Sequence, residues 1–146
     1  MNFVDILYSL PFVSPANLLL CSIAIAALLI YLPFLLVGVG RVQSGYDMGA
    51  PRAMLDKLPD YAKRATWAHQ NSFESFILYA PAALMAFTVG LPAEQVAGTA
   101  LIYIAARIAY AAFYIFDVPI LRSLSWAISM GSIFSLYFDS IQAAFV

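Results

Sequence analysis

The chain has 146 residues, of which 64% are hydrophobic and 10% are charged, and its formal net charge is −1. Soluble domains carry about 25% charged residues, so this composition leaves too little polar surface to cover a globule and predicts an all-α integral membrane protein. The slightly negative charge excludes nucleic acid as an expected partner, because phosphate binding needs a clustered basic surface.

The amino-terminal residues 1–16 have no basic region and contain Asp5, which is the wrong charge for a secretory signal peptide. Their apolar residues recur at helical spacing, so we expect an amphipathic segment that lies at the membrane interface. The single cysteine, Cys21, excludes an intramolecular disulfide, and we expect it to act as a small apolar side chain.

Four stretches are apolar enough to cross a bilayer, which needs about 20 residues of helix. We expect a single domain over residues 1–146, a four-helix transmembrane bundle with spans at about 18–39, 62–90, 93–116 and 120–140. Pro33 inside the first span predicts a kink or a local rearrangement of hydrogen bonds.

The second span is uninterrupted by polar residues only from Ser75 to Gly90, which is too short to cross. Its helix must therefore begin earlier, and Asp60 offers a side chain suited to an N-cap. The polar residues that precede Ser75 then lie within or against the membrane.

The basic residues between the first two spans set the expected orientation. Five lie there: Arg41, Arg52, Lys57, Lys63 and Arg64. The positive-inside rule places the 41–66 loop in the cytoplasm and both termini on the opposite side. The compact loops suit a bacterial inner membrane.

Two polar stripes follow from a rotation of about 100° per residue along a helix. In the second span, Arg64, Trp67, Asn71 and Glu74 fall within about 80° of one another, while His69 points elsewhere. The sequence therefore predicts one polar face over three turns of this helix.

The third span repeats this pattern with Tyr103, Arg107, Tyr110 and Tyr114, which fall within about 60°. A charge inside the bilayer is costly and normally faces a partner, and Glu74 is the obvious partner of Arg107.

Two interpretations of this pair remain open. The pair can simply fix helix packing. Alternatively, a cluster with arginine at its centre can bind a small, doubly charged polar ligand. Its expected members are Arg64, Asn71, Glu74, Arg107, Tyr114 and Arg122. We expect the small residues Ser125, Ser129 and Ser132 in the fourth span to serve packing alone.

Three motifs stand in order along these spans: "RATWAHQNSFESF" in the second span, "ARIAYAAFY" in the third and "PILRSLSW" at the start of the fourth. Together they resemble the MAPEG family, the membrane-associated proteins in eicosanoid and glutathione metabolism, and the resemblance covers about residues 18–140. It implies a homotrimer that binds glutathione between subunits near the cytoplasmic side.

The resemblance also implies roles for particular residues. The catalytic pair would be Arg122, which activates the thiol, and Tyr114. The glutathione-binding residues would be Arg41, Asn71, Glu74, Arg107, Tyr110 and Ser123. We add Arg64 to this set, because it lies on the same helix face as Asn71 and Glu74 and can partly replace an arginine of the family. His69 belongs to the motif, but its direction favours a structural role, and we expect no metal site.

The sequence departs from the eicosanoid branch at two positions, where Trp67 and Gln70 stand in place of arginines. We expect a glutathione-dependent transferase or peroxidase that acts on a hydrophobic co-substrate or lipid hydroperoxide from the bilayer. The alternative is a non-catalytic protein of the same fold that binds a lipid or an anionic metabolite. A small transporter fits less well, because the spans show no internal repeat.

Overall fold

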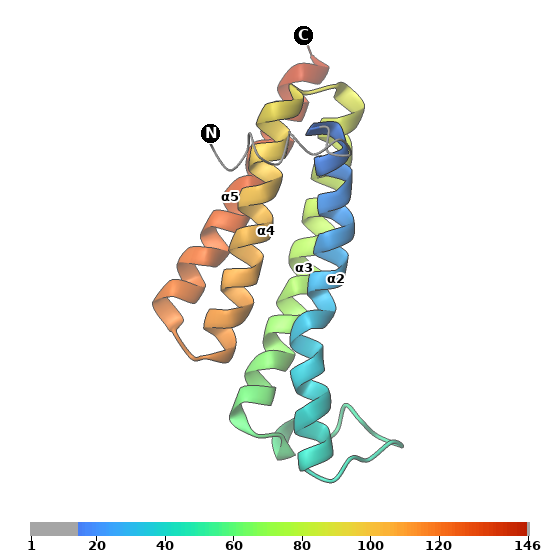
Figure 1. The fold of residues 1–146 in the computed structure, drawn as a ribbon, viewed down its shortest axis with the longest axis vertical. Coiled ribbons are helices and arrows are strands. Elements are labelled where there is room, and N and C mark those ends of the chain that lie inside the picture. The colour runs from blue at the N-terminus through green and yellow to red at the C-terminus, as the bar shows by residue number, and fades with distance from the viewer. Residues whose placement is uncertain (1–14, 146) are drawn as a thin grey trace.

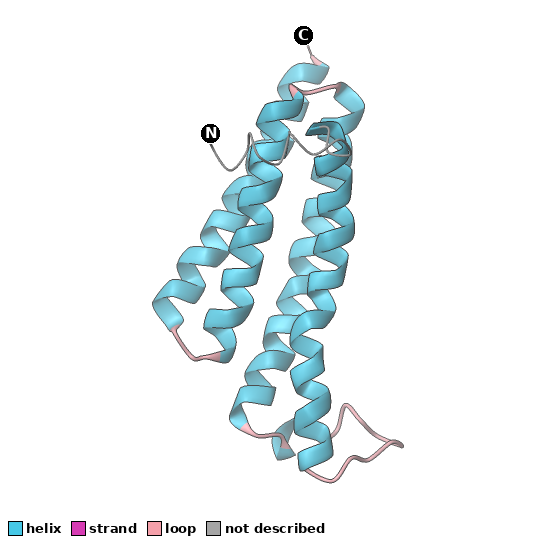
Figure 2. Cartoon of the chain, in the orientation of Figure 1, coloured by secondary structure: helices cyan, strands magenta, loops and turns pink. Residues whose placement is uncertain are grey.

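The computed structural model describes the backbone of residues 15–145 and the side chains from residue 17 onward. All regular structure in this part of the chain is helical (Figure 2). The elements are α2 (Pro15–Gln43), the short 3₁₀ helix η1 (Leu55–Lys57), α3 (Asp60–Val89), α4 (Ala93–Ile115) and α5 (Pro119–Ala144). The predicted interfacial segment before Pro15 lies outside the described residues.

The four long helices form an up-and-down bundle in which α2 packs on α3 and α4, and α5 packs on α4 and α3 (Figure 1). The 30 residues of α3 extend about 45 Å and the 23 residues of α4 only about 35 Å. Consequently α2 and α3 project beyond the α4–α5 turn, at the end that carries residues 44–59 (Figure 1).

Three helical segments within the described residues are long and apolar enough to cross a membrane: Asn17–Gln43, Asp60–Val89 and Ala93–Ile115. These three segments support the prediction of an integral membrane protein that we drew from the composition. The helix α5 has 26 residues but does not meet the same hydropathy criterion, because it is rich in serine. Large apolar side chains on α5, among them Leu124, Phe134 and Phe138, are nevertheless exposed on the isolated chain.

The start of α3 differs by one residue from the prediction. Pro59, with φ −62° and ψ 154°, is the N-cap residue, and its carbonyl accepts hydrogen bonds from the N–H groups of Ala62 and Lys63. Asp60 is already helical, so its predicted role as N-cap is wrong. Its carboxylate instead lies 3.8 Å from the Lys63 ammonium, in the first turn, where negative charge favours the helix dipole.

Small side chains fill the helix interfaces. The buried alanines of α3 are Ala62, Ala65, Ala68, Ala82, Ala83 and Ala86. On α5, Ser125, Ser129 and Ser132 are buried, and each hydroxyl donates to a carbonyl of its own helix. The burial of the three serines supports their predicted place at a helix interface, since small residues let helix backbones approach closely in membranes.

Gly40 provides a test of this close approach. A Cβ atom at Gly40 would collide with the Cβ of Ala62, whereas a Cβ at Gly38 would have no neighbour within 4 Å. We predict that Gly40→Ala lowers the melting temperature in detergent, because overpacking costs about 1–3 kcal/mol. Gly38→Ala is the matched control, and it should be neutral or stabilising, since alanine favours helix by about 1 kcal/mol. Equal melting temperatures for the two variants would contradict the assigned contact.

Candidate functional site

Arg107 lies in the interior of the bundle, where only 4% of its surface is exposed. Its Nη1 donates to Asn71 Oδ1 at 3.1 Å, and its Nη2 donates to Ser72 Oγ at 3.1 Å. Its guanidinium carbon lies 4.4 Å from the centroid of the Tyr110 ring. The charge is therefore held by two neutral acceptors on α3 and one aromatic face on its own helix.

The predicted direct pairing of Arg107 with Glu74 is wrong. Asn71 Nδ2 donates to Glu74 Oε2 at 3.1 Å, so Asn71 links the guanidinium to the carboxylate. A side-chain amide can do this because it carries both an acceptor and two donors. Among the described residues, the ion pairs within 4.0 Å are those of Lys63 with Asp60 and Arg64 with Asp117.

A cavity of about 240 Å³ opens beside this network, and we call it the Asn71 cleft. It is lined by Asn71, Tyr110, Tyr114, Arg122, Ser123 and Trp126. Five of these six residues are predicted site residues from three different helices, and the fold brings them together. Sequence reasoning missed Trp126, although it lies four residues after Arg122 and so on nearly the same helix face.

Arg122 stands in the first turn of α5, which begins at Pro119. Its guanidinium carbon lies 4.7 Å from the centroid of the Tyr114 ring, and the Tyr114 ring meets that of Tyr110 edge to face at 5.5 Å. No carboxylate lies within 4.0 Å of Arg122 among the described residues. Within residues 17–145, the positive charge of Arg122 in the lining of the cleft therefore has no direct counter-charge.

Arg64 does not reach the Asn71 cleft, contrary to the prediction. Its Nε donates to the carbonyl of Ile115 at 3.0 Å, and its Nη1 lies 3.7 Å from Asp117 Oδ2. The last carbonyls of a helix lack intrahelical donors and carry partial negative charge, so the end of α4 attracts this arginine. Trp67, one turn later, is 42% exposed, and its ring centroid lies 6.5 Å from that of Tyr114.

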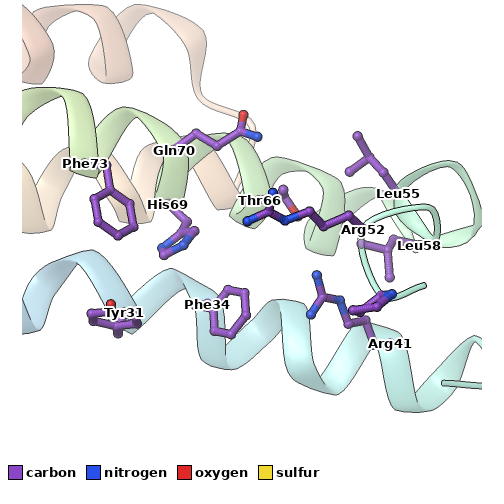
Figure 3. Close-up of a pocket in the computed structure, with 11 residues that line it drawn as sticks. Tyr31, Phe34, Arg41, Arg52, Leu55, Leu58, Thr66, His69, Gln70 and Phe73 are labelled. Carbon is purple, nitrogen blue, oxygen red and sulfur yellow. The ribbon is translucent and has the colours of Figure 1, made fainter. Parts of the chain in front are cut away.

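A second cavity, of about 620 Å³, lies between α2, α3 and the segment that joins them, and we call it the Arg41 cavity (Figure 3). Its lining is aromatic, aliphatic and basic: Tyr31, Phe34, Arg41, Pro51, Arg52, Leu55, Leu58, Thr66, His69, Gln70 and Phe73. The structure thus separates Arg41 from the other predicted ligand-binding residues.

The guanidinium of Arg41 lies over the Phe34 ring, 5.4 Å from its centroid, and its buried Nε has no hydrogen-bond partner. Within the described residues, no acidic side chain lies within 4.0 Å of Arg41 or Arg52. The Arg41 cavity therefore offers unpaired positive charge beside an aromatic wall.

His69 points away from the polar stripe, as predicted. Its Nδ1 lies 2.6 Å from the carbonyl oxygen of Ile30, and because a carbonyl only accepts, this nitrogen carries the proton. Its ring also packs against Phe34, with centroids 4.9 Å apart. His69 therefore ties α3 to α2, and it also lines the Arg41 cavity.

These features define a membrane-embedded helical bundle with a polar cleft between α3, α4 and α5. The family model of the MAPEG family matches residues 18–141. The chain belongs to the MAPEG family, which confirms the resemblance drawn from the three motifs. A search of curated proteins found no match. No group of three or more metal-ligating side chains occurs among the residues that the structure describes.

Ser72 tests the Arg107 network. Its hydroxyl donates to the Ala68 carbonyl at 2.8 Å and accepts from Arg107, whereas Ser140 only donates to a carbonyl of its own helix. We predict that Ser72→Ala lowers stability by about 1.5–3 kcal/mol, the usual contribution of a hydrogen bond to a charged group. Thermal unfolding in detergent measures this loss. Ser140→Ala is the matched control, and a loss as large as that of Ser72→Ala would contradict the network.

Proposed function

We propose that this protein is a glutathione-dependent transferase or peroxidase that acts on hydrophobic electrophiles or lipid hydroperoxides dissolved in the bilayer. Family membership supports a role of this kind. The observation that carries the proposal is the convergence of Arg122, Tyr114 and Ser123 on the Asn71 cleft, with no carboxylate in contact with Arg122.

Positive charge at this position suits a thiolate. An arginine near a thiol lowers the pKa of that thiol, because it stabilises the anion over the neutral form. The Tyr114 hydroxyl can donate a further hydrogen bond to the sulfur. The thiolate then attacks an electrophilic carbon, a C–S bond forms, and the leaving group departs with its electron pair.

Peroxidase chemistry uses the same group. The thiolate attacks the terminal oxygen of a hydroperoxide, the O–O bond breaks, and the lipid leaves as an alcohol once it takes up a proton. A second glutathione then converts the resulting sulfenic acid to a disulfide and releases water. The remaining ionic groups of the tripeptide need partners of their own, and Glu74 is an acceptor suited to its ammonium.

We further propose that the site is completed between subunits of a homotrimer. The Asn71 cleft, at about 240 Å³, is smaller than the roughly 300–1,000 Å³ of most ligand sites. On α3, Asn71 and His69 point about 160° apart, so the Arg41 cavity lies on the opposite face of this helix. Arg41 can therefore meet a ligand in the Asn71 cleft only from another copy, and a cyclic assembly joins two different faces of one protomer.

In this proposal α5 is the fourth span. It packs on two helices that meet the criteria for crossing, and apolar side chains cover its outer surface. The positive-inside rule then favours a cytoplasmic 41–66 loop with both termini opposite. This orientation puts Arg122 and the Asn71 cleft near the cytoplasm, where glutathione is soluble, while α5 faces the apolar co-substrate.

Arg122→Ala tests the catalytic assignment. We predict that this variant loses more in kcat than in glutathione affinity, because Arg122 stabilises the thiolate, and that Arg122→Lys retains part of the turnover. Steady-state absorbance assays with a chromogenic electrophile measure kcat, and the glutathione-dependent shift in melting temperature measures binding. Ligand at 100 times its dissociation constant adds about 2.7 kcal/mol of stability. An unchanged kcat in Arg122→Ala would remove Arg122 from the mechanism.

A mixed assembly tests the shared site. Co-expression of Arg41→Ala and Arg122→Ala subunits creates some interfaces in which both arginines are intact, if each site takes one from each of two copies. We predict that the mixed protein regains part of the turnover that each variant lacks when expressed alone. The double variant Arg41→Ala/Arg122→Ala mixed with wild type is the matched control. Mixed protein no more active than the two single variants would argue against a site shared in this way.

A second candidate function is a non-catalytic binder of a lipid or an anionic metabolite. It is favoured by the Arg41 cavity, where Arg41 and Arg52 face aromatic side chains without acidic partners (Figure 3). Trp67 and Gln70, in place of basic residues of the eicosanoid branch, favour it as well. A well-folded wild type that glutathione does not stabilise would make this candidate the better one.

A further inference from the structure

We propose that Arg64 is a positioning residue, which holds the α4–α5 turn and thereby sets the place of Arg122. The inference rests on the proposed function for the role of Arg122. The two contacts that Arg64 makes with the turn, which we call the Arg64 clamp, are a property of the fold. The positioning role replaces the expected role of Arg64 as a glutathione contact, because both of the contacts of its guanidinium go to residues 115–117.

The turn has an unusual backbone at Asp117. With φ of 60°, Asp117 is the one non-glycine residue with positive φ within residues 15–145. The N–H of Val118 bonds to the carbonyl of Phe113 at 2.9 Å, so α4 ends in the left-handed turn that glycine usually provides. At the end of α3, Gly90 fills the equivalent position with φ of 72°.

The Asp117 carboxylate explains why an aspartate can stand where glycine is preferred. It lies 3.7 Å from Arg64 Nη1, while Arg64 Nε holds the carbonyl of Ile115, two residues earlier. The side chain of Asp117 is 62% exposed and that of Arg64 is 24% exposed, so the carbonyl bond is the better shielded of the two contacts. The Arg64 side chain thus contacts the turn at two points, the backbone carbonyl of Ile115 and the carboxylate of Asp117.

Arg122 lies five residues after Asp117, in the first turn of α5. Its N–H bonds to the carbonyl of Val118 at 3.0 Å, directly after Asp117, and its guanidinium lies over the Tyr114 ring. Tyr114 belongs to the same turn, because its carbonyl accepts from the N–H of Asp117 at 3.3 Å. A shift of the turn therefore displaces both groups that we assign to the thiolate. Misplacement by about 1 Å can cost about a hundredfold in rate.

The experiment combines four variants with two measurements in detergent. Arg64→Ala removes the clamp, Arg64→Lys keeps only a cation, Asp117→Gly removes the need for an anchored left-handed residue, and Arg64→Ala/Asp117→Gly combines both changes. Lys63→Ala is the matched control, since the ion pair of Lys63 within residues 17–145 is with Asp60 of the same helix. Hydrogen exchange of residues 113–123 reports the order of the turn without ligand, and steady-state kinetics with glutathione give kcat and KM.

We expect Arg64→Ala to speed exchange in this segment and to lower kcat by about tenfold or more, with KM changed less than about twofold. Arg64→Lys should show smaller changes of the same kind, which keeps the test usable if Arg64→Ala folds poorly. The double variant should recover part of the slow exchange and part of kcat, because glycine adopts positive φ without an anchor, while the bond to the Ile115 carbonyl stays absent. Lys63→Ala should match the wild type in both measurements.

Three results would overturn the inference. Unchanged exchange in Arg64→Ala would show that Arg64 does not hold the turn. A large rise in KM with unchanged kcat would make Arg64 a ligand contact. A double variant that exchanges as fast and turns over as slowly as Arg64→Ala would show that Arg64 does not act through the backbone at Asp117. A wild type without glutathione turnover would instead overturn the proposed function, while the exchange data would still decide whether the clamp exists.

Discussion

The buried guanidinium of Arg107 is the constraint around which the bundle is organised. A cation in a membrane interior must find acceptors within the protein, because lipid tails provide none. Asn71 and Ser72 supply them from α3, and Tyr110 supplies an aromatic face from α4. These bonds fix the rotation of α3 against α4, and that rotation in turn presents Asn71 to the cleft.

The four arginines on the long helices have different environments, and these differences favour different roles. Arg107 is buried and donates to two acceptors on α3, and Arg64 is bound to the end of α4. Arg122 and Arg41 have aromatic contacts but no carboxylate partner within 4.0 Å among the described residues. Unpaired cations beside a cavity favour an anionic ligand, so Arg122 and Arg41, like Arg52 of the Arg41 cavity, are candidates for contact with a negatively charged group.

The helix α3 is the shared wall of both cavities. One face carries Asn71 toward α4 and α5, and the opposite face carries His69 toward α2. A single chain therefore presents two separate basic cavities instead of one enclosed site. Such a division is what an assembly of identical subunits would require, because each copy then offers different halves to its two neighbours.

Local sequence patterns predicted the helical membrane class, the extents of the helices to within a few residues, the polar stripes on two spans and the family. These features depend on local composition and on the 3.6-residue period, which are properties of neighbouring residues. The partner of each stripe residue, in contrast, follows from the packing of the helices. Asn71 lies between Arg107 and Glu74, Arg64 binds the end of α4, and Arg41 faces the other cavity. These contacts depend on how each helix is rotated and on where it ends relative to its neighbours. A backbone carbonyl or a neutral amide at the right place can bind an arginine in place of the carboxylate that a sequence pattern suggests.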